Sequence, residues 1–293
     1  MGALRDLRQP SATRSPWHWL RRGLSQLVVH GFLLAGAVFM LLPFVWMLIT
    51  SIKPPDEIFN ATMSLWPKHF YGVENYHFAL TSAPLLRFAL NGAFVCACIL
   101  AVQLLVAIPC AYALAKLRFP GRQTLFVLTL LALAVPVQVP ALPIYIALAD
   151  LGLLNTYFSM MVPFFLSVFA IFLLRQFFKG FPDDIIHAAR LDGMGELEIV
   201  WRIVTPSAWP AIAAFAVFSI VAHWNDLYWP LIVISDAKLA PPPLGMMFFA
   251  DAETGSNYGA LTAAATILTA PLVVAFLFAR RHFIEGITMT GVK

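Results

Sequence analysis

The residues of this chain that could do chemistry are concentrated in a polar insert, residues 182–206, between two long apolar runs. The insert mixes one histidine with acids and bases: Asp183, Asp184, His187, Arg190, Asp192, Glu196, Glu198 and Arg202. Its apolar residues recur at helical spacing, which predicts an amphipathic unit that would dock on a partner or lie on a lipid surface. A lipid-surface helix typically carries one rich basic face, and here acids are mixed with the bases. The pattern therefore favours docking on a partner.

Catalytic motifs are missing from the sequence. It contains no G-x-x-x-x-G-K-[ST] phosphate loop, no H-E-x-x-H zinc motif and no G-x-S-x-G nucleophile motif. The three cysteines share one apolar segment without further ligands nearby, so we expect inert thiols and no metal site. Ionisable residues inside the apolar runs are almost limited to His30, His223 and Asp226. An ion-coupled transporter normally needs several such groups, so another subunit must supply the energy for any uphill transport.

Composition places the chain in a membrane. Of its 293 residues 60% are hydrophobic and only 12% charged, with a mean hydropathy of +0.80, whereas a soluble domain carries about 25% charged residues. Several charge-free intervals exceed the roughly 20 residues that a helix needs to cross a bilayer. They predict an all-α integral membrane protein with six transmembrane helices, near residues 27–50, 86–114, 124–147, 157–177, 207–234 and 258–279.

The distribution of Lys and Arg predicts the orientation. Of the 19 such residues, all but four (Lys53, Lys68, Arg87 and Lys238) lie in the two terminal segments, the loop near residues 115–123 and the region of the insert. Because positive charge accumulates on the cytoplasmic side, both termini and the insert are expected there. Residues 1–22 are expected to form a disordered basic arm, followed by a transmembrane domain over residues 23–293.

Within the insert, local signals predict two short helices joined by a hinge. Pro182 suits the first position of a helix, and Gly193 suits a left-handed end to it. The second helix is expected over residues 196–204. Thr205 and Pro206 are expected to be the N-cap and the first position of the fifth span.

Other polar residues in the spans suggest contacts between helices or a path for a solute. Asn91 and Gln103 are expected to bond to neighbouring helices. Three prolines around Gln138 preclude one regular third helix, and the bend would serve either packing or a pathway. Trp224, Asn225 and Asp226 would either contact a solute or tie helices together. Tyr228 and Trp229, which follow them, are better suited to the aromatic belt at the membrane interface.

The spacing of the insert resembles a family signature. Permease subunits of bacterial binding-protein-dependent ABC importers carry E-A-A, three residues, Gly, nine residues and I-x-L-P at this place. The matching residues are Ala188, Ala189, Gly193, Ile203 and Pro206, whereas His187 stands for the Glu and Thr205 for the Leu. The resemblance to the carbohydrate type, which includes maltose and glycerol-3-phosphate permeases, runs from the first span to Lys293. It includes the segment 224–233 and the tail 284–293.

The resemblance implies the type I ABC importer permease fold, without catalysis in this chain. The helix around His187, Ala188, Ala189, Asp192 and Gly193 would be a coupling helix held by a cytoplasmic ATPase, and Ile203 and Pro206 would complete that region. Because His187 replaces the family Glu, an ion pair with an ATPase arginine would be lost.

The partners implied are two ATP-binding subunits that carry ATP and Mg, a sister permease, an extracytoplasmic solute-binding protein and membrane lipid, but no nucleic acid. Sugar or a sugar-like solute would be the cargo, in the bacterial inner membrane. The alternatives are a self-contained secondary carrier and, with less support, a membrane enzyme or scaffold.

Overall fold

The computed structural model describes residues 16–59, 65–252 and 257–288, and side chains within 25–59, 65–250 and 257–278. These residues form helices and connecting turns, and none of them is in a strand. The α-helices are α1 (Pro16–Thr50), α2 (Pro55–Ile58), α3 (Gly72–Ser82), α4 (Leu85–Lys116), α5 (Arg122–Leu133), α6 (Ala141–Asp150), α7 (Tyr157–Met161), α8 (Val168–Lys179), α9 (Asp183–Leu191), α10 (Glu196–Ile199), α11 (Thr205–Ser207), α12 (Trp209–Trp224), α13 (Tyr228–Val233), α14 (Pro242–Ala252) and α15 (Tyr258–Thr288). Two 3-10 turns, η1 (Val162–Phe164) and η3 (Ala237–Leu239), and a π-helical turn, η2 (Val200–Val204), complete them.

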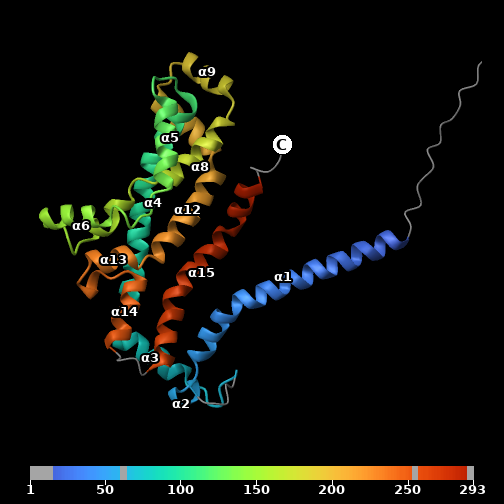
Figure 1. Ribbon diagram of the computed structural model, residues 1–293, viewed down its shortest axis with the longest axis vertical. Helices are drawn as coiled ribbons and strands as arrows, with labels where there is room; N and C mark the ends of the chain where they lie inside the picture. Colours follow the sequence, from blue (N-terminus) through green and yellow to red (C-terminus); the bar gives the residue numbers. More distant parts are fainter. Residues whose placement is uncertain (1–15, 60–64, 253–256, 289–293) are drawn as a thin grey trace, which may run out of the picture.

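Helix α4 is the central element of the body. It packs against α8 and α12 and also contacts α14 and α15 (Figure 1). Buried side chains form two clusters along it. One joins the first half of α4 to α14 and α15, and the other joins its second half to α8, α9 and α12. Both clusters are apolar, as burial inside a membrane protein requires.

The spans differ in regularity. Three helical segments are long and apolar enough to cross a membrane without interruption: Ser25–Thr50, Leu85–Lys116 and Tyr258–Phe278. Counting two bent helix pairs, the described residues hold up to five such spans. The all-α membrane fold is thus confirmed, whereas the count of six stays a prediction.

The proline-rich third span is divided into two short helices. Helix α5 ends at Leu133 and α6 begins at Ala141, and neither is long enough to cross a bilayer alone. Pro136 and Pro140 lie in the break, where Val139 donates its backbone N–H to the Pro136 carbonyl at 3.0 Å. In Figure 1, α6 projects sideways from the body. The expectation of an irregular third span is correct, but a single helix over 124–147 is wrong.

The fourth and fifth spans are also interrupted. The fourth bends by 44° between Phe164 and Val168. In the fifth, α12 ends at Trp224 and α13 begins at Tyr228, so residues 225–227 divide the predicted helix. Trp209 follows an 81° bend after α11.

Helix α1 stands apart from the other helices. It begins at Pro16, which makes the last residues of the predicted arm helical, and the arm's first 15 residues lie outside the described part. No residue in the most apolar 18-residue stretch of its span is buried within the chain. Figure 1 shows it diverging from the body after a contact near α15. Lipid or another chain must therefore cover its apolar surface.

At the end of the molecule opposite α9, hydrogen bonds hold the backbone that follows the last residue of α1. Asn75 on α3 donates from Nδ2 to the carbonyls of Ser51 and Lys53, at 3.0 and 2.9 Å. The backbone N–H of Tyr71 bonds to the Ile52 carbonyl at 3.0 Å. These bonds satisfy carbonyls that follow the end of α1, where helical partners are lacking.

Close packing around Gly245 predicts that a larger residue there destabilises the protein. A Cβ on Gly245 would lie 2.3 Å from a ring carbon of Phe88, which is 2% exposed. We expect Gly245→Ala to destabilise the protein by about 1–3 kcal/mol, because the ring must move in a packed core. Thermal unfolding of the detergent-purified chain measures this. Gly36→Ala is the control, since nothing lies within 4 Å of its Cβ position; equal unfolding midpoints for the two variants would contradict the packing.

Candidate functional site

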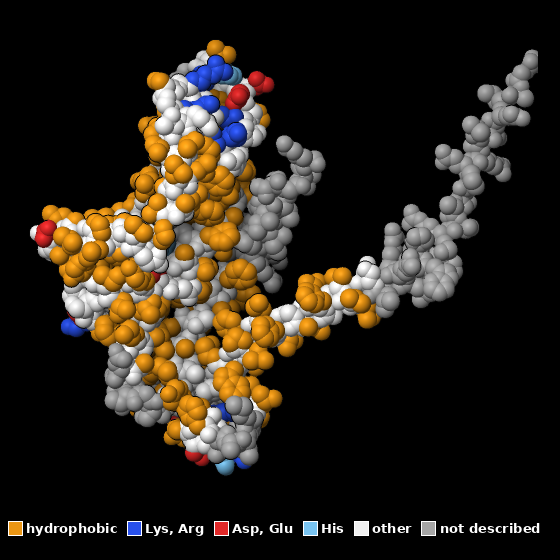
Figure 2. Space-filling model, viewed as in Figure 1, with side chains coloured by type: hydrophobic (Ala, Val, Ile, Leu, Met, Phe, Trp, Pro, Cys, Tyr) orange, Lys and Arg blue, Asp and Glu red, His pale blue; other side chains and the backbone are white. Residues whose placement is uncertain are grey.

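The insert forms one end of the molecule. It consists of α9, a turn at Gly193, α10, the π turn η2 and α11. Figure 1 shows α9 at the end of the body away from α2 and α3, and Figure 2 shows Lys and Arg side chains gathered there on an otherwise largely hydrophobic surface. A charged unit is thus set beyond the apolar body.

The turn after α9 has the geometry predicted from its glycine. Gly193 has φ +84°, in the left-handed region. Its N–H bonds to the Arg190 carbonyl at 3.1 Å, and the N–H of Met194 bonds to the Ala189 carbonyl at 3.0 Å. This pair of bonds is a Schellman motif, which satisfies the last carbonyls of a helix. The predicted glycine turn between the two helices of the insert is therefore present.

Two other details of the insert were predicted wrongly. Pro182 is the N-cap of α9 and not its first helical residue. Thr205 is not an N-cap, because helical structure continues through it to Ser207, and α12 begins at Trp209. Its hydroxyl donates instead to the Val200 carbonyl at 2.7 Å. That bond lies within the helical turn, so the hydroxyl is not available to the next helix.

A carboxylate joins the two helices of the insert to α4. Glu196 accepts from Arg190 Nε on one oxygen and from the Tyr112 hydroxyl on the other, each at 2.7 Å. The Tyr112 residue is 1% exposed. The hydrogen bond from Arg190 lowers the pKa of Glu196, and burial opposes this less strongly. The carboxylate therefore binds α9, α10 and α4 together when it is ionised.

A lysine makes a second connection at the start of α9. Lys116, at the end of α4, donates to Asp183 Oδ1 and to the Phe181 carbonyl, both at 2.6 Å. The hydrogen bond with Lys116 lowers the pKa of Asp183. Nearby, Arg175 on α8 donates to the Leu114 carbonyl at 3.1 Å and lies over the Phe126 ring. The end of α4 is thus tied to both α8 and α9.

The signature residues divide between the surface and the core. Ala189 is 3% exposed and belongs to the buried cluster, whereas Ala188 is exposed. The other exposed members are His187, Asp192, Gly193 and Pro206, and Ile203 is half-buried. Leu191 is 89% exposed beside them. The insert thus presents an apolar and polar surface that no described part of the chain covers.

The predicted path residues are not brought together by hydrogen bonds within the described chain. Gln138 is exposed in the α5–α6 break, and Trp224 is 7% exposed at the end of α12. Asn225 donates to the Val221 carbonyl at 2.8 Å, and Asp226 accepts a 3.4 Å bond from the Trp229 N–H. These bonds are local to the break between α12 and α13. The described bonds of Asn225 and Asp226 therefore do not join separate helices, both alternatives for these residues stay predictions, and Asn225 is exposed.

Trp229 is a core residue, contrary to the prediction of an interfacial one. It is 3% exposed, and its indole N–H donates to the Ser159 carbonyl at 2.8 Å. Tyr228 is 43% exposed. The two aromatic residues are adjacent in the sequence, so the sequence predicted the same environment for both. Adjacent residues of a helix point in different directions, and here one is buried and the other partly exposed.

Buried polar contacts occur at the other breaks. As predicted, Asn91 and Gln103 bond to other elements. Asn91 donates to the carbonyls of Lys238 and Ala240 and accepts from the Tyr157 hydroxyl. Gln103 donates to the Phe164 carbonyl at 2.8 Å and accepts from Ser219 Oγ at 2.6 Å.

The role of Asn155 was missed by the sequence reasoning. It adopts φ +58° and accepts from the N–H groups of Ser235 and Asp236. Its position in a Gly- and Asn-containing connection between apolar runs was the available signal.

The fold is that of a multi-pass membrane protein with a polar, exposed insert at one end of its apolar body. The family model for binding-protein-dependent transport system inner membrane components matches residues 103–288. The chain belongs to this family, and is therefore a non-catalytic inner-membrane permease subunit that works with an ATPase and a solute-binding protein.

Curated relatives match most of the chain. The arabinooligosaccharides transport system permease protein AraQ of Halalkalibacterium halodurans is 30% identical, over 92% of this chain and 97% of that protein. The diacetylchitobiose uptake system permease protein NgcG of Streptomyces coelicolor is 32% identical, over 87% and 85%. The sn-glycerol-3-phosphate transport system permease protein UgpE of Brucella abortus is 31% identical, over 92% and 98%.

A solved structure has the same fold. A chain of a bacterial ABC transporter involved in the import of the acidic polysaccharide alginate superposes with a TM-score of 0.76 at 21% identity, covering 94% of this chain and all of that one. The overall fold of this chain is thus one that a solved bacterial ABC transporter chain shares.

The contact between Glu196 and Tyr112 yields a prediction. Glu196→Ala should destabilise the protein by about 1 kcal/mol, because it leaves a buried tyrosine hydroxyl unpaired and removes a partly exposed ion pair. Glu198→Ala is the matched control in the same helix, because its i,i+4 pair with Arg202 is largely exposed and contributes about 0.3–0.5 kcal/mol.

The stability difference between wild type and Glu196→Ala should depend on pH. The pKa of Glu196 is lowered in the fold from an ordinary value of 4.5. Its stabilisation is therefore fully present above pH 4.5 and is lost as the pH falls through the folded pKa. Thermal unfolding from pH 7 to pH 3 should show the gap between wild type and Glu196→Ala closing. A gap that is constant with pH would contradict the ionised carboxylate as its source.

Proposed function

We propose that this chain forms half of the translocation path of an ATP-driven importer of a sugar or sugar-like solute. The observation that carries the proposal is an exposed insert with the family spacing, on a chain that belongs to the family over most of its length. The relatives' names support a carbohydrate cargo, since they refer to arabinooligosaccharides, diacetylchitobiose and glycerol 3-phosphate. A self-contained secondary carrier is disfavoured by the same membership.

The insert, residues 183–205, is proposed as the coupling segment. Helix α9 would lie in a groove of an ATP-binding subunit, with ATP and Mg bound there and not in this chain. Exposed Ala188 permits close approach, and exposed Leu191 offers apolar surface for the groove. Glu196 and Lys116 hold the insert to α4, which supports transmission of a displacement into the spans.

The assembly proposed contains a sister permease, two ATP-binding subunits and an external solute-binding protein. Both termini would be cytoplasmic, as the distribution of Lys and Arg predicts. Gln138, Trp224, Asn225 and Asp226 remain candidates for the path. Exposed Asn225 is the best placed of them for a solute or for the sister subunit.

Reconstitution tests the function. The chain, its sister permease and its ATPase in proteoliposomes should take up a solute only with ATP inside and the loaded binding protein outside. Screening saccharide-loaded binding proteins for stimulation of ATP hydrolysis identifies the solute. Uptake that follows an ion gradient without ATP, and that Asp226→Asn abolishes, would establish the secondary carrier instead.

The hinge provides a sharper prediction. Gly193→Val should lower uptake at least tenfold while ATP hydrolysis persists, because a β-branched residue at positive φ disfavours the turn by about 1–2 kcal/mol. Gly193→Asn should retain most uptake, since Asn tolerates the left-handed region.

Gly195→Val is the matched control. Gly195 has φ −75° and ψ 157°, an extended conformation that valine adopts readily, and nothing lies within 4 Å of its Cβ position. Both quantities, solute uptake and ATP hydrolysis, are measured in the same proteoliposomes. Normal coupled uptake with Gly193→Val would count against the insert as the coupling segment.

A further inference from the structure

A basic cavity lies beside the insert, between α9 and the turn that joins α4 to α5. It has a volume of about 720 Å³. Its lining includes five basic residues, Lys116, Arg118, Arg122, Lys179 and Arg190, together with His187 and a single acid, Asp183. Such an excess of like charge in one hollow is unfavourable unless an anion compensates it.

The described residues do not supply that anion. Asp183 is bonded to Lys116, and Arg190 uses Nε for Glu196 outside the lining. Arg122 donates one bond, to the Leu117 carbonyl at 2.9 Å. The side chains of Arg118 and His187 make no hydrogen bond or ion pair with a described residue, although the charge of Asp183 acts on both. The cavity thus holds donors in excess of its acceptors.

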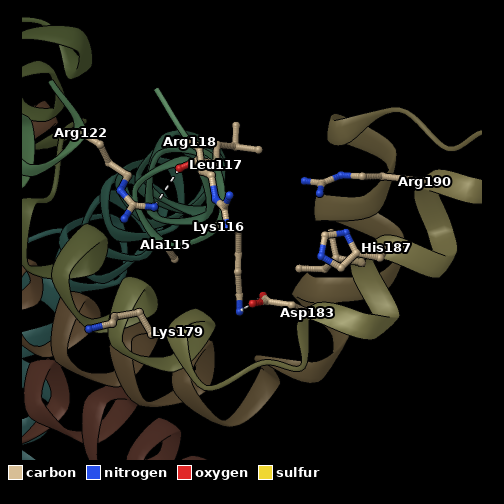
Figure 3. A pocket seen from close by; sticks show the side chains of 10 residues that line it. Ala115, Lys116, Leu117, Arg118, Arg122, Lys179, Asp183, His187 and Arg190 are labelled. Atoms are coloured by element: carbon tan, nitrogen blue, oxygen red, sulfur yellow. Dashed lines mark hydrogen bonds and ion pairs between the residues drawn. The ribbon is translucent and has the colours of Figure 1, made fainter. Parts of the chain in front are cut away.

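The donors face one space from two walls. Figure 3 shows Arg190 and His187 on α9 pointing across the cavity toward Arg118 and Lys116. A smaller hollow of about 360 Å³ is also lined by Arg118 and Arg122. Both arginines can therefore donate to a group in either hollow, and guanidinium groups match phosphate oxygens in pairs.

Apolar surface begins directly beside these cations. Arg122 is the first residue of α5, and Leu125 and Leu128 in its next turns are 51% and 54% exposed. Lys116 is likewise the last residue of the transmembrane helix α4. The cavity is thus at the level where spans end, with basic groups on one side and exposed leucines on the other. Such a surface is complementary to an amphiphilic ligand with a negatively charged headgroup.

We propose that this cavity binds the phosphate headgroup of an anionic phospholipid from the membrane leaflet at the α9 end. Basic pockets between the ends of transmembrane helices suit such headgroups. The phosphate lies between Arg118 and Arg190, and the acyl chains run along the exposed leucines of α5. A soluble phosphate would make no use of that apolar surface. Ala188 lies on the opposite flank of α9 from Asp183 and Arg190, so a protein partner can hold that flank while the cavity takes a lipid.

Lipid retention by the full-length chain tests the site. The chain is purified in mild detergent, and native mass spectrometry counts bound phosphatidylglycerol against phosphatidylcholine with identical acyl chains. Wild type should retain the anionic lipid in preference. Arg118→Gln should weaken retention about fivefold, and Arg118→Gln with Arg122→Gln by about fivefold more, from roughly 1 kcal/mol per cation.

Two matched variants accompany the test. Arg87→Gln removes the same charge from an exposed residue at the opposite end of α4, and should leave retention at that of wild type. Arg118→Lys keeps the charge and should keep most of the retention. Unfolding midpoints of all variants verify that the fold persists.

Three results would overturn the proposal. Equal retention of phosphatidylglycerol by wild type and the double variant would show that the lipid is held elsewhere. Displacement of the lipid by equimolar inorganic phosphate would identify the cavity as a site for a free anion. Release of the lipid when the ATP-binding subunit is added would assign the cavity to an acidic surface of that partner.

Discussion

Backbone carbonyls released at helix breaks are the constraint on which this structure depends. Within a bilayer no water satisfies them, and an unpaired carbonyl costs several kcal/mol. The chain interrupts its third, fourth and fifth predicted spans. At the break in the fourth, and at several helix ends and turns, a side chain from another element donates to a backbone carbonyl. The donors are Asn75, Asn91, Gln103, Lys116, Arg175 and Trp229. Each bond joins segments distant in sequence, so satisfying the backbone also assembles the fold.

The end of α4 shows how this constraint prepares the candidate site. Lys116 and Arg175 bond to carbonyls at that end while Tyr112 reaches Glu196 in the insert. The polar insert is therefore not an appendage on a flexible loop. It is held at both of its helices by a span that also forms the middle of the body. The insert is therefore linked directly to the spans through α4.

The general fold could be predicted because its signals are local. A run without charges predicts a span from composition alone, and the apolar segments of α1, α4 and α15 agree with the predicted ranges, although α1 and α15 extend beyond them. Gly193 was recognised because a left-handed turn leaves few choices of residue. The exposed insert followed from its charges. In the same way, polar residues inside apolar runs predicted the bonds of Asn91 and Gln103.

What failed depends on long-range contacts. The prolines predicted a break in the third span, but not that α6 would contact α13. Trp229 was assigned to the interface because nothing in its neighbours reveals that Ser159 offers a carbonyl to its indole. The π turn after α10 and the 81° bend at Ala208 also have no local signature stronger than an ordinary helix followed by proline. For the candidate site, spacing located the residues but not their exposure.

The unequal burial of Ala188 and Ala189 has an evolutionary consequence. Ala189 is enclosed by the chain's own core, so the space that its neighbours leave should restrict it to small residues in any descendant, whichever ATPase is present. Ala188 faces outward, so its substitutions should covary with residues of another gene product. Two adjacent residues of one signature are thus expected to be under different constraints, Ala189 from packing within this chain and Ala188 from contact with another chain.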